Sequence, residues 1–430
     1  MVPSGAAAGQ AKARGALPRG KPPALPSPAR RLLAARAVMS LGQGALGVDF
    51  ALYARALGWT PVLLGLVVGA GILLGGGMTA VAGPLSDRLG RKPFLLGYLL
   101  VVALASMLAV ASGRVAVVAG VAIIAGFGRG AVGVPGLFGA VQQVWLADLV
   151  TGPQLARSLA RNAAVGFFGT AIGALLGGLP HLWRAALPGA LAYRPLFALS
   201  AVATFAAVAL MAGLADLRRA PPPPRPGDEA DEDAAARRGE NRLLWQLAGI
   251  NAVNGLAIGL TGPLLSWWLA ERFGAGPGLI GPAIGATLVA SGLATLVAGR
   301  VSTRFGILRV VLAMRTAGLA ILVLMPFSPT FGLAMLANAA RTVLNRGTAG
   351  QRQALVLGAV RGHRRGLAAS VSGVSTQLPR ALGPWIAGLL FGAGWLAGPF
   401  LLAAVLQGGY LLLYRRVFAG QAGAGKGDGG

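Results

Sequence analysis

The sequence predicts an all-α polytopic membrane protein with twelve transmembrane helices in two six-helix repeats and both termini in the cytoplasm. Three observations predict this fold class: the hydropathy of the chain, the lengths of its apolar segments and an internal repeat. Of the 430 residues, 55% are hydrophobic and 12% are charged, and the mean hydropathy is +0.69. Because so few polar residues are available to cover an apolar interior, this composition excludes a soluble globule.

Twelve segments are mostly apolar over about 20 residues, the length that a helix needs to cross a bilayer. At this length in lipid only a helix satisfies its own backbone polar groups, so all twelve are predicted as α-helices. In chain order they cover residues 32–53, 62–82, 94–112, 115–137, 163–182, 196–214, 243–270, 279–298, 310–327, 331–357, 367–391 and 396–414.

Polar segments flank and divide these spans. Residues 1–31 are rich in Pro, Ala and Gly without an apolar core, so a disordered tail is expected and not a cleaved signal peptide. Residues 217–242 hold half of the 12 acidic residues and are predicted as a flexible cytoplasmic linker between six-helix bundles of residues 32–216 and 243–416. A regulatory role for the acidic cluster is the alternative. Residues 417–430 form a second cytoplasmic tail.

The charge distribution predicts the orientation. Of the 38 Lys and Arg residues, 26 fall in loops and tails on the side of the termini, five in the opposite loops and seven inside spans. Since basic residues favour cytoplasmic loops, both termini are predicted in the cytoplasm, in a multi-pass protein of the inner (plasma) membrane. A net charge of +26 would suggest nucleic-acid binding in a soluble protein. In a membrane protein the basic residues of the cytoplasmic loops explain this charge, so the lipid bilayer is expected as a partner and a nucleic acid is not.

Residues that the chain lacks exclude several functions. It contains no Cys and only two His, His181 and His363, so neither a disulfide, a metal site nor a His-based catalytic dyad is expected. The phosphate-binding loop G-x-x-x-x-G-K-[ST] does not occur, which argues against ATP hydrolysis. We therefore expect neither enzymatic activity nor a cofactor. We also expect a monomer.

The two halves of the chain repeat each other. A shift of 216 residues without a gap pairs Pro61 with Pro277 and Arg88 with Arg304, as well as a serine and several glycines. A parallel repeat of six plus six helices is typical of transporters whose two halves rock around a site between them.

The loop between the second and third spans carries the most specific motif. Residues 83–92 read Gly-Pro-Leu-Ser-Asp-Arg-Leu-Gly-Arg-Lys, which resembles the inner-loop signature G-x-L-[SA]-D-R-x-G-R-[KR] of the major facilitator superfamily. The resemblance extends from the first span to the last. It implies a twelve-helix secondary transporter, similar to drug/proton antiporters, that works by alternating access.

The resemblance also implies that this loop is a conformational latch. Asp87 is expected at the positive N-terminal end of the eleventh span, and Arg88 or Arg91 is expected to pair with Asp148 after the fourth span. In the second repeat Thr303 replaces the acid, so the latch is predicted mainly on the first half. The predicted latch residues are Gly83, Asp87, Arg88, Gly90, Arg91, Lys92 and Asp148.

Two further motifs of the family match only in part. Arg129 and Gly133 resemble the R-x-x-Q-G element of proton-linked members, although Val132 replaces its Gln. The glycines within 169–178 resemble the antiporter element G-x-x-x-G-P-x-x-G-G, with Ala174 in place of its Pro. The second element favours export, although glycine-rich helices also pack closely for purely structural reasons.

Asp49 is the only acidic residue inside a predicted span. A charge in the middle of the bilayer costs about 3 kcal/mol on insertion scales, so Asp49 should face a cavity or a partner. We expect Asp49 to carry a coupled proton and Arg129 to tune it. The alternative is a permanent ion pair that fixes helix packing.

Polar residues of several spans are candidates for a substrate cavity. Spans 1, 4, 7 and 10 line the central cavity in the family, which implies a cavity containing Tyr53, Asn251, Asn254, Asn338, Arg341, Asn345 and Arg380. The polar residues of span 10, which are Asn338, Arg341 and Asn345, recur every three or four residues on one side of a helix. The same pattern continues to Thr348 and Arg352. Several cations against one acid suit anionic, zwitterionic or neutral compounds. The alternative for Arg341 and Arg352 is bonding to backbone carbonyls or lipid phosphate.

These patterns together predict a secondary active transporter that moves a small organic molecule, with proton-coupled export as the leading hypothesis. Uptake or exchange of an organic anion is the alternative within this class. A non-transporting receptor or lipid-handling protein on the same scaffold is a remote alternative. Asp87 argues against it, because only a cycling protein needs the latch.

Overall fold

The computed structural model describes residues 25–129, 137–150, 153–215, 234–305, 307–347 and 365–424, and their regular secondary structure is helical throughout. The first half contains α1 (Ser27–Ala56), α2 (Pro61–Leu89), α3 (Arg91–Ala111), α4 (Val115–Ala125), α5 (Leu137–Leu149), α6 (Pro153–Leu176), α7 (Pro180–Trp183), η1 (Gly189–Tyr193) and α8 (Arg194–Ala212). The second half contains α9 (Ala234–Thr261), α10 (Leu265–Phe273), α11 (Pro277–Phe305), α12 (Ile307–Leu324), η2 (Met325–Phe327), α13 (Phe331–Gly347), α15 (Arg365–Gly392) and α16 (Gly398–Ala424).

Seven helical stretches among the described residues are long and apolar enough to cross a membrane. They are Pro61–Gly83, Arg91–Ala111, Arg157–Trp183, Gly189–Ala212, Leu244–Phe273, Pro277–Ala294 and Arg309–Phe327. The helix Val115–Ala125 is apolar but shorter. The all-α fold is thus confirmed, whereas the count of twelve spans and their orientation stay predictions.

The predicted span 115–137 is not one continuous helix. Helix α4 ends at Ala125, and the chain turns through Gly126 and Gly128, whose φ angles are +75° and +74°. Glycine adopts this left-handed conformation at little cost, and it stops the helix. The turn leaves room for a cavity, as described below.

The predicted span 243–270 is also interrupted, because α9 ends at Thr261 and α10 begins beyond Pro263. Proline lacks a backbone donor and clashes with the preceding helical turn. At its other end α9 begins at Ala234, so the last nine residues of the predicted linker 217–242 are helical, and the linker bounds stay a prediction. The sequence Ala-Ala-Ala-Arg-Arg from Ala234 consists of strong helix formers, which explains the earlier start.

Helices also extend into the ranges predicted as tails. Helix α1 begins at Ser27 and α16 continues to Ala424, inside the ranges 1–31 and 417–430. The rest of both tails and most of the linker lie outside the described residues.

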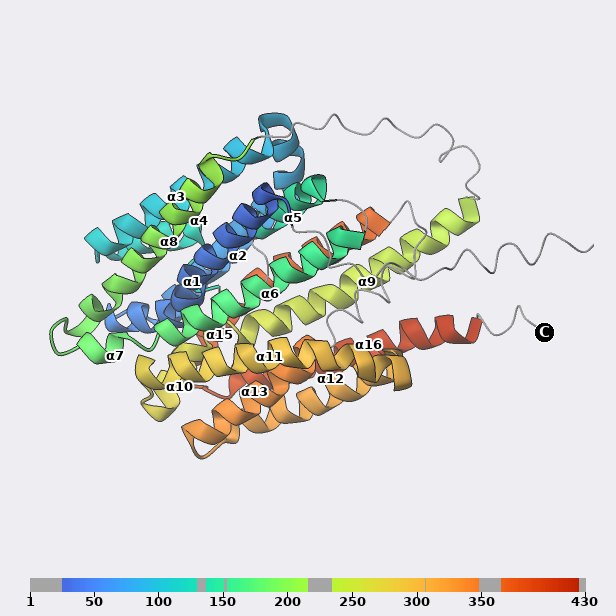
Figure 1. The fold of residues 1–430 in the computed structure, drawn as a ribbon. Helices are drawn as coiled ribbons and strands as arrows, with labels where there is room; N and C mark the ends of the chain where they lie inside the picture. Colours follow the sequence, from blue (N-terminus) through green and yellow to red (C-terminus); the bar gives the residue numbers. More distant parts are fainter. Residues whose placement is uncertain are drawn as a thin grey trace, which may run out of the picture.

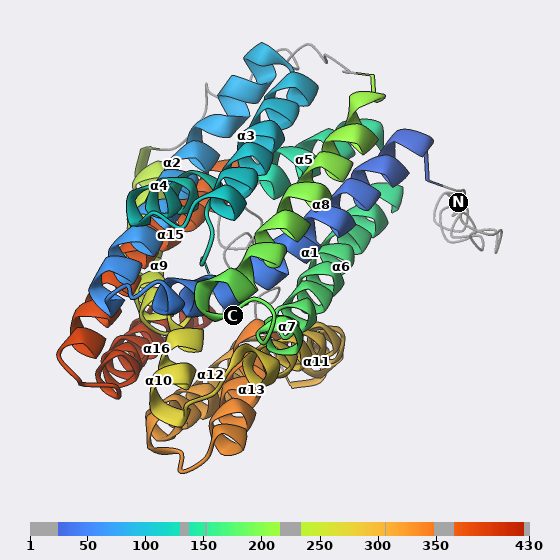
Figure 2. The same ribbon diagram turned by 90° about the vertical axis from the view of Figure 1, so that its left-hand side faces the viewer.

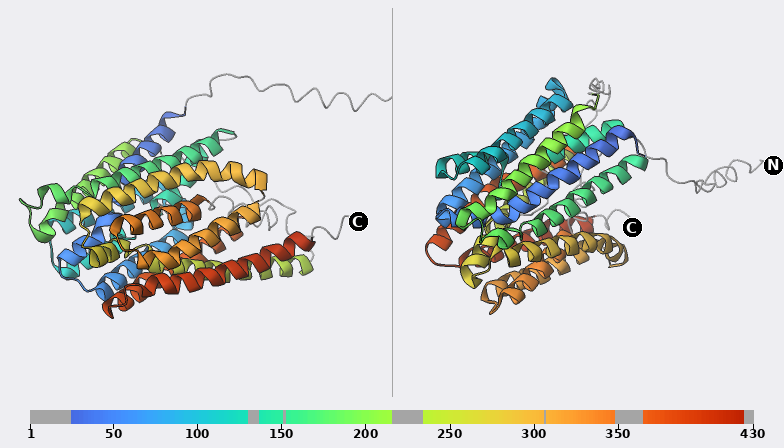
Figure 3. Two further views of the ribbon diagram at one scale, coloured as in Figure 1. Left: turned by 90° about the horizontal axis from the view of Figure 1, so that it is seen from below. Right: turned by 60° about the vertical axis from the view of Figure 1, so that its left-hand side comes forward.

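The helices form two groups that face each other. Figure 1 shows α1 to α8 in blue to green on one side and α9 to α16 in yellow to red on the other. At the interface α2 packs against α15 and α6 packs against α11, two pairs that Figure 2 shows side by side. The long helices run along one common direction, so the molecule has two ends (Figure 3). We call the end with α7 and α10 the loop end, and the end where α1 begins and α16 ends the terminal end.

The buried apolar side chains indicate which end is closed. The largest cluster joins both halves around the loop end and includes Phe50 and Phe197 from the first half and Trp268 from the second. Toward the terminal end the clusters separate, with one around Leu95 in the first half and another around Val311 in the second.

Close approach of helix backbones at glycines seals the loop end. Gly65 of α2 lies against the carbonyl of Pro384 in α15, and Gly281 of α11 lies against Gly178 at the end of α6. A Cβ at Gly281 would stand 2.5 Å from the Gly178 nitrogen, which no side chain tolerates. Glycines nearer the terminal end of the same interface helices face open space, namely Gly83, Gly292 and Gly373. The two halves therefore meet at the loop end and part toward the terminal end.

Candidate functional site

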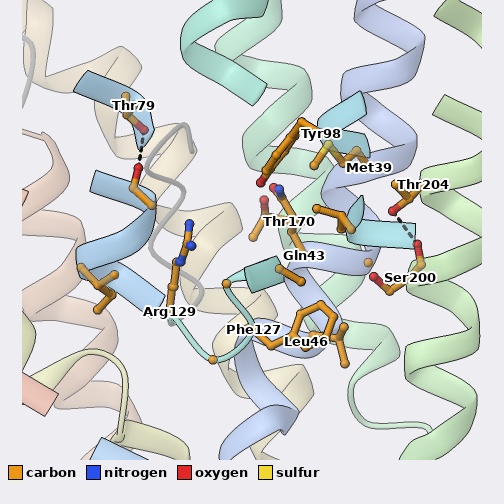
Figure 4. Close-up of a pocket in the computed structure, with 18 of the residues that line it drawn as sticks. Met39, Gln43, Leu46, Thr79, Tyr98, Phe127, Arg129, Thr170, Ser200 and Thr204 are labelled. Atoms are coloured by element: carbon orange, nitrogen blue, oxygen red, sulfur yellow. Dashed lines mark hydrogen bonds between the residues drawn. The ribbon is translucent and has the colours of Figure 1, made fainter. Parts of the chain in front are cut away.

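A cavity of about 120 Å³ lies mainly within the first half and reaches α15 of the second. Its walls come from α1, α2, α3, the turn after α4, α6, α8 and α15. Figure 4 shows Arg129 on one side and Gln43, Tyr98 and Thr170 across from it. The charged and polar lining residues are Arg36, Gln43, Thr79, Tyr98, Arg129, Thr170, Ser200, Thr204, Gln377 and Arg380, with no Asp or Glu among the described lining residues.

The turn that ends α4 shapes the wall of the cavity nearest the loop end. Phe127 in this turn packs against Phe50 of α1 and Phe197 of α8, with ring centroids 6.3 Å and 5.4 Å away. A Cβ at Gly128 would stand 2.5 Å from the Phe50 ring, so the close approach requires glycine. Because helix α4 stops here, the Arg129 side chain turns into the cavity beside Gly75 of α2.

Three arginines give the cavity its positive charge. Arg380 connects the two halves, since its Nη2 donates to the backbone oxygen of Arg129 at 3.2 Å, while its Nη1 donates to Gln377 Oε1 at 3.3 Å. Arg36 lies beside Gly166 of α6. The Nε atom of each arginine is buried without a hydrogen-bond partner among the described residues, as is Nη1 of Arg36. The cavity therefore contains unsatisfied cationic donors and no acidic side chain from the described part of the chain to neutralise them.

Of the residues predicted to form the cavity or to tune the proton site, Arg129 and Arg380 line this cavity. Tyr53 instead packs in the first half against Phe197, with ring centroids 4.9 Å apart. Asn338 and Asn345 lie on α13, where Asn338 is buried and the amide of half-buried Asn345 faces Gly318 of α12. Thr348 and Arg352, which extend the predicted stripe, lie outside the described residues.

Three further predicted residues bind neighbouring helices of the second half. Asn251 of α9 donates to Ser372 Oγ of α15 at 3.0 Å. The Asn254 side-chain oxygen accepts from Arg315 of α12 at 3.1 Å, and Arg341 donates to Thr261 Oγ1 at 3.2 Å. In this conformation these groups hold the second half together and do not line the cavity.

Sequence reasoning missed most of the lining residues in the first half. Arg36, Met39, Gln43 and Leu46 lie on one face of α1 because they recur at steps of three or four residues. The sequence did contain one signal for this face: Arg36 lies inside an apolar span, two helical turns before the polar residue Gln43.

Asp49 is buried beneath the loop end and is not among the residues that line the cavity. It is 1% exposed, and neither carboxylate oxygen has a hydrogen-bond partner among the described residues. One of these oxygens lies against Gly177, at the end of α6 beside the contact with α11. The expected pairing with Arg129 is not present, because no described residue forms an ion pair with Asp49.

The predicted latch residues gather around Arg91 at the terminal end. Arg91 forms an ion pair with Asp148 of α5, donates to the Val144 carbonyl at 3.3 Å and lies 3.5 Å from the Asp87 carboxylate. Gly90, at φ +93°, makes the turn between α2 and α3. The other predicted latch residues flank this turn: Gly83 faces open space, Arg88 is exposed and Lys92 is half-buried.

The expected contact of Asp87 with the start of the eleventh span is not seen in this conformation. The Asp87 side chain is 65% exposed, and its ion pair within the described part of the chain is with Arg91. The loop therefore links α2, α3 and α5 of the first half, consistent with the separation of the two halves at the terminal end.

At the loop end an ion pair joins the two halves. Arg55 Nη2 at the end of α1 lies 2.9 Å from Glu271 Oε2 of α10, and the guanidinium lies 6.0 Å from the Trp267 ring. Both charged side chains are less than half exposed.

Comparisons with known proteins agree with this architecture. A family model described as Major Facilitator Superfamily matches residues 32–247 and 247–426. Comparison with curated proteins finds no match. Among solved structures, the chain is similar to a bacterial homologue of the human lysosomal transporter Spinster in an inward-facing, unoccupied conformation, with 12% identity, a TM-score of 0.70 and coverage of 92% of this chain and 99% of that one. It is also similar to the nucleoside transporter NupG (13% identity, TM-score 0.66, 91% and 98% coverage) and to a D-xylose-proton symporter (14%, 0.64, 88% and 96%).

Proposed function

The chain belongs to the major facilitator superfamily of membrane transporters, and from this premise we propose that it carries a small organic anion by alternating access. Of the hypotheses that the sequence leaves open, this is the one that the cavity favours. We further propose that the protein acts as a monomer in the inner (plasma) membrane. With cytoplasmic termini, the structure corresponds to an inward-open state.

The cavity charge carries this proposal. Arg36, Arg129 and Arg380 each present a buried, unpaired Nε, and no Asp or Glu is among the described lining residues. A carboxylate, phosphate or sulfonate would satisfy these donors through charge-assisted hydrogen bonds. A volume of about 120 Å³ holds roughly four waters, which fits the anionic head group of a small molecule.

Transport into proteoliposomes tests the proposed substrate class. A set of carboxylates, phosphates and sulfonates is compared with neutral and cationic analogues of the same size. A hydrogen bond to a charged group contributes about 1.5–3 kcal/mol, so Arg36→Gln and Arg380→Gln should each weaken substrate binding by roughly 10- to 100-fold. Arg309→Gln removes an exposed charge at the start of α12 and serves as the control. Equal transport of neutral or cationic analogues would contradict the proposal, as would an equal loss in Arg309→Gln.

Proton-coupled export is a second candidate, which Asp49 favours. The carboxyl group is buried beneath the closed loop end and has no hydrogen-bond partner among the described residues. It lies next to the α6–α11 contact, which would separate when the protein opens outward. Opening that contact would hydrate Asp49, and closing it would favour the neutral, protonated acid. Since Arg129 does not contact Asp49, we assign Arg129 to substrate binding.

The variant Asp49→Asn distinguishes coupling to protons from movement of the substrate itself. We expect the variant to lose transport driven by a pH gradient and to retain exchange of substrate between the two sides of the membrane. Gradients of both signs distinguish export from uptake. If Asp49→Asn concentrates substrate as well as the parent does, Asp49 has only a packing role.

The latch role of residues 83–92 also stays a proposal. In the inward-open state Arg91 binds Asp148 within the first half, and Asp87 is exposed. We propose that Asp87 contacts the start of α15 only when the terminal end closes.

A further inference from the structure

A groove of about 510 Å³ runs along the surface of the first half between α1 and α6. The groove is deep where small residues meet, because Gly169 of α6 lies against Ala37 of α1. Larger apolar side chains form its walls, among them Leu33 and Leu41 of α1 and Ile172 of α6.

The groove opens away from the cavity described above. Leu33, Ala37 and Leu41 follow each other at steps of four residues, whereas Met39 and Leu46 of the same helix line the cavity. At about 100° per residue these two sets occupy opposite faces of α1. On the α6 side Phe168 and Ile172 are 48% and 49% exposed. In a membrane protein this outer surface faces lipid.

Arginines border the end of the groove that lies toward the terminal end. Arg161 of α6 is part of the lining, and Arg157 lies one turn earlier on the same face of that helix. Helices α1 and α6 run in the same direction, and the contact of Ala37 with Gly169 sets their register, which brings Arg30 level with Arg161. All three arginines are exposed, and none forms an ion pair with another described residue.

The length of the groove matches one leaflet. From Arg161 to Ile172 the helix rises roughly 16 Å at 1.5 Å per residue. The hydrocarbon core of a bilayer is about 30 Å thick, so the groove spans about half of it. A cationic end followed by an apolar groove of this length is complementary to one phospholipid.

We propose that the groove between α1 and α6 binds one acyl chain of an anionic phospholipid from the leaflet at the terminal end, with the phosphate on Arg161 and with Arg157 and Arg30 beside it. The excess of basic residues places this end in the cytoplasm, and anionic lipids attract basic residues at the cytoplasmic leaflet. A second copy of the chain is a poorer occupant, because two such grooves would bring like charges together.

Native mass spectrometry of the delipidated full chain in a neutral detergent tests the proposal. Phosphatidylglycerol and phosphatidylcholine with identical acyl chains are titrated separately, and so is inorganic phosphate. We expect the first phosphatidylglycerol to bind at least tenfold more tightly than phosphatidylcholine. In Arg157→Gln/Arg161→Gln this preference should disappear. Arg415→Gln/Arg416→Gln removes two exposed charges from α16 and should retain it.

A second variant tests the apolar part of the site. Ala164 lies in the groove and is exposed, so Ala164→Trp should fill the groove without disturbing the core and should weaken binding of the first phosphatidylglycerol at least tenfold. Val202→Trp on α8, where Val202 is 66% exposed, is the matched control. The proposal is overturned if the arginine pair can be removed without loss of preference, if both tryptophan variants bind lipid equally, if inorganic phosphate binds as tightly as the lipid, or if the groove mediates a dimer.

Discussion

At the scale of single residues, Arg91 organises the inner-loop motif. Gly90 turns the chain between α2 and α3 with a positive φ, and Arg91 then lies between Asp87 and Asp148. The side chains of Arg91 and Asp148 are 17% and 15% exposed, so solvent and salt screen this pair less than a surface pair. Asp87 is 65% exposed and contributes little to the stability of this conformation.

Asp87→Asn therefore separates folding from cycling. We expect its unfolding free energy to stay within about 0.5 kcal/mol of the parent, because exposed pairs contribute little. Transport should nevertheless be abolished or greatly slowed, because the closed terminal end would lack the charge that contacts α15. Thermal unfolding and proteoliposome transport measure the two effects. Thr303→Ala, at the equivalent position of the second repeat, should do much less, and a comparable loss in both variants would contradict an asymmetric latch.

At the scale of helices, an ion pair and close backbone packing both close the loop end, and they differ in how much they stabilise the closed form. The Arg55–Glu271 pair is about 40% exposed, so it contributes at most about 1 kcal/mol. At Gly281 the opposing atoms belong to the backbone of the last turn of α6 and of the two glycines that follow it, which cannot rotate away from an added side chain. Backbone packing at small residues, more than the ion pair, is therefore expected to determine whether the loop end closes.

Gly281→Val should favour opening of the loop end. Spin labels at Leu182→Cys and Leu279→Cys, on exposed positions near this contact, should shift to longer distances when measured by pulsed electron resonance. Gly292→Val lies on the same helix but faces open space, and it should leave the distance distribution unchanged. The packing argument fails if the two valine variants give the same distribution.

At the scale of the whole molecule, one continuous apolar core joins the halves at the loop end, and two separate cores lie toward the terminal end. This is the arrangement expected of halves that rock about a shared contact, as proposed above. The cavity with its three arginines lies next to this contact, and Arg380 reaches across it to Arg129. In the proposed outward opening this hydrogen bond would break, which would couple the cavity to the movement of the two halves.

A cross-linking experiment in this cysteine-free chain tests the rocking movement. Gly83→Cys on α2 and Gly373→Cys on α15 introduce thiols on the two halves, at positions that face open space near the terminal end. A short bifunctional thiol reagent should join them poorly in the parent and efficiently once Gly281→Val is added, because opening of the loop end closes the terminal end. Equal cross-linking with and without Gly281→Val would contradict rigid-body rocking.

The sequence by itself determined the helical membrane fold. It offered Arg88 and Arg91 as alternative partners of Asp148, and the structure shows Arg91 in that place. An apolar composition places a chain in the bilayer however its segments pack, and in lipid the backbone must satisfy its own polar groups. The helical membrane fold could therefore be predicted from the sequence. Residues 83–92 are adjacent in sequence, so their motif could be recognised without knowledge of the rest of the fold, but the ion pair of Asp87 with Arg91 was not predicted from it. Helix breaks at Gly126 and Pro263 were less visible, because apolar residues continue on both sides of each break.

Only the tertiary structure decided which polar residues face the cavity. Spacing along a helix determines which side chains share a face, but packing against other helices determines where that face points. Asn254 and Arg341 lie in spans whose polar residues were predicted to face the cavity, yet Asn254 binds Arg315 and Arg341 binds Thr261 inside the second half. Arg36 and Gln43 of α1 face the cavity instead. The carboxylate of Asp49 likewise points to α6 and not to Arg129, because the close contact between α1 and α6 fixes the rotation of α1.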